Sequence, residues 1–256
     1  MLTHVAGMEP AITLAMQPFS RGRYSAVIAQ AEDGFGDVQK LRGLCFGASG
    51  AKTDEFDSKC SQILIRRSAD HKLVASFRIL ALTGETLYQS YSAQHYALES
   101  LTTFKGRMLE MGRFCIHPDE NDPDILRIAW AVLTAFVDKH DIKLLFGCSS
   151  FVGTQASNYQ SAFSVLQNRH LAPMRWRPQR KAPETISIAS IASDNSQPRK
   201  AMVQMPPLLR TYLLMGGWVS DHAVIDRELN TLHVFTGVEV DKIPPARKRL
   251  LRATVA

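Results

Sequence analysis

The order of hydrophobic segments predicts an α/β (α+β) fold, in which helices flank one mixed, mostly antiparallel sheet. Segments 61–67 and 72–80 are predicted strands joined by the tight turn SADH, which indicates a β-hairpin. A strand at 105–117 is followed by a helix at 124–140 and a strand at 141–151. Because that helix is apolar on nearly every side, we expect it to be buried against the sheet.

Weaker patterns predict the other elements. Segment 38–46 has apolar residues at helical spacing, and 47–59 is rich in glycine and acids, as loops are. Asp122 can cap the long helix, with Pro123 at its first position and Asp124 complementing its dipole. The chain further predicts a helix at 157–170, a short helix within 206–219 and a strand at 232–240.

These elements form one predicted domain over residues 23–243. Residues 1–22 are expected to be a flexible lead-in, and residues 244–256 a basic tail. Within the domain, residues 172–204 are basic and serine-rich, which indicates a connection rather than a core element.

The net charge of +6 and a pI of about 9.2 favour an acidic partner. Nucleic acid is not expected, because no helix-turn-helix, zinc-finger or RNP-like pattern occurs. Positive charge gathers at 169–181 and 247–252. Each cluster is either a solvated surface or a docking surface.

The composition also bears on location. Four scattered cysteines without a CxxC pair indicate reduced, mostly buried thiols and no metal site. The N-terminus lacks a secretory signal, and no window approaches the roughly 18 apolar residues of a membrane span. We expect a cytoplasmic protein, with peripheral contact at the inner face of the membrane left open.

Four short stretches carry polar residues in places that a core would not need. Each has a plain structural explanation: an arginine in a strand is often an edge residue, paired aspartates often form turns, and a nearby acid and base often form an ion pair. The stretches are LRGLCF with Arg42 and Phe46, TDEFD with Asp54 and Asp57, ASFRIL with Arg78, and MLEMGRFCI with Glu110 and Arg113.

In this order, the four stretches resemble the GNAT acyltransferases, in the branch that takes acyl groups from acyl carrier protein and includes the acyl-homoserine-lactone synthases. The second half is similar to the ornithine Nα-acyltransferases, through FGCSSFVGT, RHLAP and PPLLRTYLLMGGWVSDHAVIDRELNT. Met111 stands where that pattern has leucine, a departure without chemical consequence.

The resemblance implies transfer of a 3-hydroxyacyl group from acyl carrier protein to the α-amine of L-ornithine, the first step of ornithine-lipid synthesis. A free α-amine titrates near pH ~8, so only modest base assistance is needed. Glu110 is the candidate base or ammonium holder, and Arg113 would fix that carboxylate or grip the substrate carboxylate. Backbone N–H groups near 112–116 would meet the oxyanion. The substrate-binding candidates are Arg42, Phe46, Asp54, Asp57 and Arg78, with the two aspartates holding the ornithine ammonium groups.

The absence of a glycine-rich loop indicates which acyl donor the protein uses. Members of the superfamily that use coenzyme A bind its pyrophosphate with a glycine-rich loop, and HPDENDPDI has no glycine in that place. Acyl carrier protein, with one phosphate and an acidic helix, suits both this loop and the charge of +6. No cofactor beyond its phosphopantetheine arm, and no metal, is expected. The carrier-docking candidates are Arg169, Arg175, Arg177, Arg180 and Lys181.

Two other functions stay open at this point. One is an acyl-homoserine-lactone synthase, which the long C-terminal block disfavours. The other is a catalytically silent GNAT-fold protein that binds an acyl carrier or a membrane.

Overall fold

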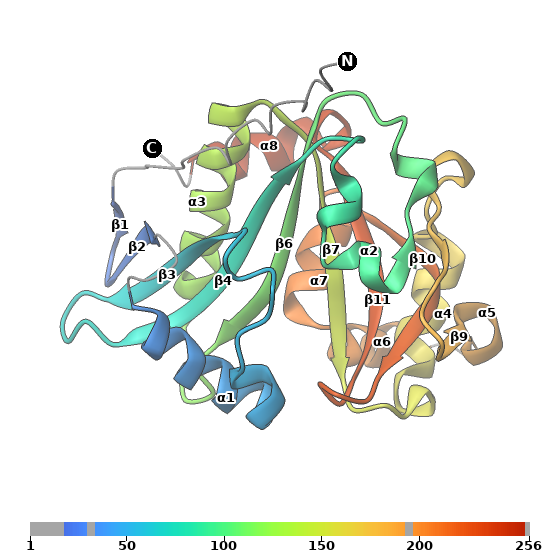
Figure 1. Cartoon of the computed structure of the whole chain (residues 1–256), viewed down its shortest axis with the longest axis horizontal. Coiled ribbons are helices and arrows are strands. Elements are labelled where there is room, and N and C mark those ends of the chain that lie inside the picture. The colour runs from blue at the N-terminus through green and yellow to red at the C-terminus, as the bar shows by residue number, and fades with distance from the viewer. Residues whose placement is uncertain (1–17, 30–33, 193–196, 254–256) are drawn as a thin grey trace, which may run out of the picture.

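The computed structural model describes residues 18–29, 34–192 and 197–253. Within them, one nine-stranded sheet crosses the molecule (Figure 1). Its strands are, in spatial order, β1 (Phe19–Arg21), β2 (Tyr24–Ala29), β3 (Ser61–Arg67), β4 (Leu73–Leu82), β6 (Arg107–Ile116), β7 (Ile142–Val152), β11 (Thr231–Glu239), β10 (Trp218–Asp226) and β9 (Thr185–Ser187). β6 and β7 run parallel and the other neighbouring pairs antiparallel, so the predicted mixed, mostly antiparallel sheet is confirmed.

Helices cover both faces of this sheet. They are α1 (Phe35–Ala51), α2 (Ser92–His95), α3 (Pro123–His140), α4 (Gln160–Arg169), α5 (Ile188–Ile191), α6 (Pro198–Gln204), α7 (Pro207–Leu214) and α8 (Pro245–Ala253). Single 3₁₀ turns lie at Leu87–Gln89, Glu99–Leu101, Ala156–Tyr159, Met174–Trp176 and Val240–Lys242, and a small ribbon pairs β5 (Tyr96–Ala97) with β8 (Gln179–Arg180). In the described part of the chain, no helix is both long and apolar enough to cross a lipid bilayer.

α3 is the connection that a parallel strand pair requires, since β6 and β7 cannot be joined by a tight turn. Its cap is the predicted one: the Asp122 carboxylate accepts the Asp124 N–H at 2.9 Å. Ile128, Leu133 and Phe136 are buried in the core beneath the sheet, which confirms the expected buried helix.

The two faces of the sheet differ in chemistry because successive side chains point to opposite sides. Phe77 and Ile79 of β4 pack in the core that holds α3, whereas Arg78 between them points to the other face. That other face is covered by α1 and by the segment 83–104, which contains α2 (Figure 1). The polar residues of the site lie on this second face.

Residues 19–21 and 245–253, near the two ends of the chain, are more ordered than predicted. Residues 19–21 form β1 at the sheet edge, so they do not belong to a flexible lead-in; residues 1–17 lie outside the described residues. Residues 245–253, predicted as a loose tail, form α8, which Arg252 ties to Asp138 of α3 at 2.9 Å. Leu251 of α8 packs against the core that holds α3, a contact that the basic composition of the segment concealed.

Other segments also differ from the prediction. Residues 47–51 continue α1 past a kink at Gly47 (φ 75°), where a loop was expected. The connection 172–204 contributes β8, β9, α5 and α6, so it is a structured part of the domain. No element was predicted for β2, β10 or the segment 83–104. The two strands belong to the sheet that carries the site, and the segment covers one face of that sheet.

Candidate active site

The parallel strands β6 and β7 separate partway along their length. Their register runs from Arg107–Ile142 to Glu110–Phe146 and has no recorded pair beyond that point. Gly147 marks the last close approach, because a Cβ there would lie 2.2 Å from the Met111 carbonyl oxygen. Glycine is therefore required at this position, and the strands open directly after it.

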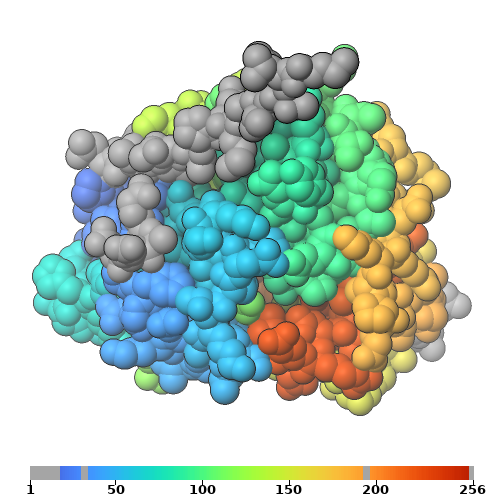
Figure 2. Space-filling model, in the orientation of Figure 1, coloured from blue at the N-terminus to red at the C-terminus, as the bar shows by residue number. Residues whose placement is uncertain are grey.

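A cavity of about 270 Å³ occupies the opening. β6 and β7 line it with residues 110–114 and 148–150, and residues 206–209 at the start of α7 close another side. Figure 2 shows the surrounding segments on this face: the light-blue loop after α1, the green segment 83–104 and the orange-red strands β10 and β11. The remaining polar or aromatic lining comes from Phe46, Arg78, Tyr91, Asp226 and His233.

Glu110 is buried beside this cavity, with 4% of its surface exposed. One carboxylate oxygen accepts the Ser92 N–H at 2.7 Å and the other the Tyr91 N–H at 2.9 Å. Burial raises the pKa of Glu110, and these hydrogen bonds with the Arg78 charge oppose the rise without cancelling it. Each oxygen keeps a further lone pair, so the group can still accept a proton from a bound amine.

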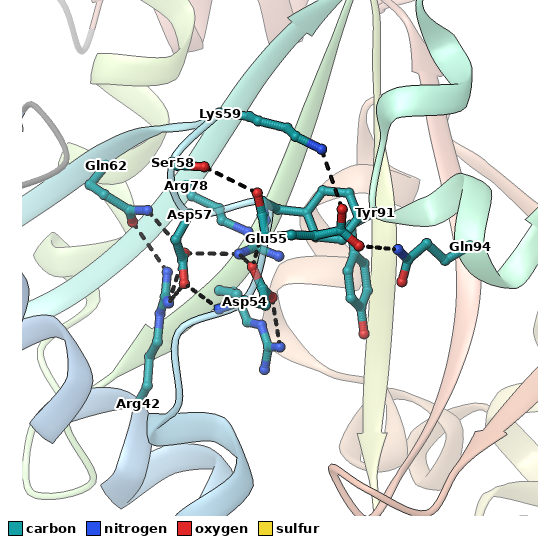
Figure 3. Close-up of polar contacts among 12 residues, drawn as sticks. Arg42, Asp54, Glu55, Asp57, Ser58, Lys59, Gln62, Arg78, Tyr91 and Gln94 are labelled. Atoms are coloured by element: carbon teal, nitrogen blue, oxygen red, sulfur yellow. Dashed lines mark hydrogen bonds and ion pairs between the residues drawn. The ribbon is translucent and has the colours of Figure 1, made fainter.

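The four charged side chains of Arg42, Asp54, Asp57 and Arg78 form a network of hydrogen bonds and ion pairs (Figure 3). The Asp57 carboxylate accepts Arg42 Nη1 at 2.9 Å, Arg78 Nη1 at 2.8 Å and Gln62 Nε2 at 3.3 Å, and it also accepts the Asp54 N–H at 3.1 Å. Asp54 then accepts a short hydrogen bond from the same Arg78 nitrogen. The network joins α1, the loop after it and β4 into one unit.

Arg113 reaches this network from a distorted point of β6. Its φ of +52° lies in the left-handed region, and the β4–β6 register shifts between Arg78–Gly112 and Ser76–Cys115. This β-bulge turns the Arg113 side chain toward Asp54, which accepts its Nη2 at 3.0 Å. Its guanidinium also lies 5.7 Å from the Tyr91 ring centre.

The two guanidinium groups at the cavity keep unused donors. Nη2 of Arg78 and both Nε and Nη1 of Arg113 are buried without a hydrogen-bond partner among the described residues. Buried donors of this kind are normally paired, so they indicate a place for an anionic ligand. Burial raises the pKa of Asp54, but the hydrogen bonds and charges of Arg78 and Arg113 outweigh it and hold that pKa below its usual range.

The structure therefore brings the predicted residues together but changes several roles. Phe46, Arg78, Glu110 and Arg113 line the cavity. Arg113 is paired with Asp54, not with Glu110. Arg42 and Asp57 are buried at 1% and 4% exposure, paired with each other and outside the cavity lining.

The expected role of the two aspartates is corrected accordingly. Asp57 cannot hold a substrate ammonium group, because each of its oxygens already accepts two hydrogen bonds from within the protein. Asp54 is more exposed, but its carboxylate is shared between Arg78 and Arg113. Both aspartates instead orient the arginines, a role that sequence spacing does not distinguish from substrate binding.

The carrier-docking candidates lie along one stretch of chain, from the last residue of α4 to the residue after β8. Arg169, Arg175, Arg180 and Lys181 are exposed residues, whereas the half-buried Arg177 donates to the Ala172 carbonyl at 3.0 Å. Lys181 Nζ donates to the Ala93 carbonyl at 2.6 Å, one residue from the amide that contacts Glu110. Arg175 lies 3.7 Å from Glu239, at the far end of β11 from the cavity.

The cavity residues that the sequence did not single out include Tyr91, Asp226 and His233. Tyr91 lies in the segment without a predicted element. Asp226 belongs to the D-x-x-x-N-T pattern and ends β10 at a turn, which could have marked it as a strand-end acid. His233 alternates with buried Leu232 and Val234, so its pattern is that of an ordinary half-polar strand.

A model of the acetyltransferase (GNAT) domain matches residues 42–131. A protein of Rhodobacter capsulatus named L-ornithine N(alpha)-acyltransferase is 31% identical over 189 residues, which cover 72% of this chain and 72% of that protein. A Rhizobium meliloti protein of the same name is 28% identical over 74% of this chain and 67% of its own length. The N-acyl amino acid synthase FeeM from uncultured soil microbes has 12% identity and a TM-score of 0.47, over 90% of this chain and 99% of that one.

The opened sheet and its buried carboxylate define an N-acyltransferase of the GNAT class. The resemblance stated from the sequence motifs is thereby confirmed. The chain belongs to the L-ornithine N(alpha)-acyltransferase family.

Proposed function

We propose that this protein transfers a 3-hydroxyacyl group from acyl carrier protein to the α-amine of L-ornithine and so forms lyso-ornithine lipid. The observation that carries the proposal is one cavity in which the carboxylate of Glu110 lies beside the unused donors of Arg78 and Arg113. An α-amino acid offers the complementary groups, an ammonium and a carboxylate on one carbon. The names of the relatives point to ornithine as that amino acid.

The chain's own groups supply what thioester aminolysis requires. Arg78 and Arg113 bind the α-carboxylate through charge-assisted hydrogen bonds, and Glu110 takes a proton from the α-ammonium. The neutral nitrogen attacks the thioester carbonyl carbon, the C–N bond forms, and the C–S bond breaks as the thiolate leaves. Glu110 passes this first proton to solvent, and the nitrogen, which is positively charged after the attack, gives its second proton to Glu110. The thiolate receives that second proton, so one proton is released to solvent and the reaction balances without a covalent enzyme intermediate or a cofactor.

The bulge of β6 suits the oxyanion of that step. Arg113 and Phe114 have no recorded register partner in either β4 or β7. Their backbone N–H groups lie at the opening between the strands and are the proposed donors to the thioester oxygen. Donors fixed in the backbone stabilise the developing charge without reorganising.

The start of α3 supports a carrier protein rather than coenzyme A as donor. Asp122 caps this helix and Asp124 lies in its first turn, where a pyrophosphate would otherwise meet free N–H groups. The Asp122 carboxylate thus occupies the place that a phosphate would take at this helix end. The single phosphate of a carrier-bound phosphopantetheine, together with the net charge of +6, fits this protein better.

A second groove supports a path for the acyl chain and a peripheral membrane contact. It shares Phe46, Phe114 and Pro206 with the cavity and reaches the surface at the exposed side chains of Leu44, Val152 and Val203. Apolar side chains at the mouth of a groove suit the tail of an amphipathic product. We propose that the product leaves toward the inner membrane face by this route, from a cytoplasmic enzyme.

The proposal is tested by incubating the purified full chain with 3-hydroxyacyl carrier protein or 3-hydroxyacyl-coenzyme A and a panel of amino acids. Mass spectrometry of the products and release of free thiol are measured together. We expect the acyl-ornithine product with the carrier thioester and much less with coenzyme A. A homoserine lactone product, or no thiol release, would remove the proposal.

Arg113→Ala is expected to lower kcat/KM for the amino acid by about 10- to 100-fold, because one charge-assisted contact to its carboxylate is lost. The measurement is initial rate against amino-acid concentration at saturating donor. Arg107→Ala, an exposed arginine of the same strand, serves as the control and should leave the rate unchanged. An equal fall with a decarboxylated diamine would contradict the carboxylate role.

The double variant Arg175→Ala/Arg180→Ala is expected to raise the apparent KM for the carrier about 2- to 30-fold, as two exposed ion pairs would. The effect should shrink with added salt, and kcat should persist. Arg252, whose side chain is 60% exposed like that of Arg175, provides the control Arg252→Ala. An unchanged KM for the carrier at low salt would exclude Arg175 and Arg180 as docking contacts.

A further inference from the structure

The cavity has two arginines on one side of β7 and an acid with a histidine on the other. Arg78 and Arg113 come from β4 and β6 on one side, and Asp226 and His233 come from β10 and β11 on the other. At about 4.8 Å per strand, the backbones of β6 and β10 are separated by roughly 14 Å or more. Side chains reaching inward from both strands leave a gap that a short extended molecule can span.

Asp226 is a carboxylate without a cation of its own. It is half-buried at the end of β10, and one oxygen accepts the Leu229 N–H at 2.9 Å within the hairpin turn. No lysine or arginine forms an ion pair with it among the residues that the structure places. The adjacent Arg227 points elsewhere, since Glu184 accepts its Nε at 2.8 Å and its Nη2 at 2.6 Å.

His233 adds an acceptor to the same side of the cavity. The Tyr96 hydroxyl donates to the His233 carbonyl at 2.8 Å, so the 3.1 Å contact to Nδ1 assigns the ring proton to Nδ1. Nε2 is then a bare acceptor, buried and without a partner in the described ranges. Burial lowers the pKa of His233 to about 3, so the ring stays neutral and does not repel a cation.

Tyr91 and His95 form an aromatic pair close to both sides of the cavity. Their ring centres are 4.9 Å apart. The pKa of His95 is lowered mainly by burial; the charge of Asp226 raises it and that of Arg113 lowers it. Asp226 and Arg113 are therefore both close to His95.

We propose that Asp226 binds the side-chain ammonium of the amino-acid substrate, with His233 as a second acceptor, and so selects a diamino acid of one length. The inference rests on the proposed function and identifies the part of the site that distinguishes ornithine from amino acids with apolar side chains. Arg78 and Arg113 fix the α-carboxylate, and Asp226 can pair with the second nitrogen only when that nitrogen lies at one distance from the carboxylate. A site built to bind an ammonium rejects an analogue that lacks one, because its carboxylate would be left unpaired.

The test compares ornithine with norvaline, which has the same carbon chain without the terminal amine, and with the diamino acids one methylene shorter and longer. Asp226→Asn retains the oxygen that accepts the Leu229 N–H, so the hairpin should persist. We expect kcat/KM for ornithine to fall about 10- to 100-fold, while that for norvaline changes less than about 3-fold. The preference for one diamino-acid length should flatten as well.

Glu228→Gln is the matched control, since it removes an exposed acid from the same turn and should keep the wild-type selectivity. Asp226→Glu is the conservative variant; with its carboxylate one methylene further on, it should shift the preference toward the shorter diamino acid. Thermal unfolding followed by circular dichroism separates loss of fold from loss of selectivity. Equal losses on ornithine and norvaline would overturn the assignment. Failure of the wild-type protein to acylate ornithine would instead count against the proposed function itself.

Discussion

Glu110→Gln is expected to lower kcat about 100-fold or more, the scale of lost general-base catalysis. Glutamine has nearly the same shape, so the cavity would be retained while the proton acceptor is removed. One of the two amides at Tyr91 and Ser92 would also lose its acceptor, at a cost of about 1–3 kcal/mol in unfolding free energy. Rates must therefore be compared at a temperature where both proteins are folded.

The pH dependence of the rate adds a second readout. Because burial raises the pKa of Glu110 above its ordinary value of 4.5, the wild-type rate should fall as pH drops through that raised value and protonates the base. The residual rate of Glu110→Gln should lack this acid limb. Glu85→Gln, an exposed acid in the same covering segment, is the control. A Glu110→Gln rate within about 3-fold of wild type would show that Glu110 is not the base.

Arg78→Met is expected to reduce the unfolding free energy by about 3–5 kcal/mol, the cost of removing one partner from a buried ion pair. Arg78 is 2% exposed and donates to both Asp54 and Asp57, so its loss leaves two carboxylates short of a counter-charge. Urea denaturation measures the change. Arg127→Met, which breaks a pair 59% exposed on its arginine side, should cost no more than about 1 kcal/mol.

Acid should narrow the difference between Arg78→Met and the wild type. The folded-state pKa of Asp54 lies below its ordinary 3.8, so the stability from this pairing is present above pH 3.8 and is lost as pH falls through the depressed value. The two unfolding free energies should therefore converge below about pH 4. A constant difference down to pH 2 would mean that Arg78 stabilises the fold by packing alone.

Most of the strands that carry the site could be predicted from local patterns. β3, β4, β6, β7 and the buried α3 have periodicities that local sequence expresses directly, and the Asp122 cap is a local interaction. The gathering of Arg42, Asp54, Arg78 and Arg113 followed from a resemblance in motif order, since no spacing rule connects residues 71 positions apart.

The remaining features depend on distant contacts. The division of labour within the charged network is one of them: Asp57 is enclosed by Arg42 and Gln62 from two other elements, so its burial could not be read from its loop. Segment 83–104 folds into short turns that take their shape from the sheet beneath. Its apolar residues follow neither the helical nor the strand periodicity. The positive φ of Arg113 likewise follows from the bulge against β4.

The grip on Glu110 has a consequence for how this enzyme tolerates substitution. Its two oxygens are held by main-chain amides, which every amino acid except proline supplies. The alignment of the carboxylate should thus survive exchange of the side chains at positions 91 and 92, while proline at either would release it. Relatives could then vary both side chains and keep the carboxylate of Glu110 aligned.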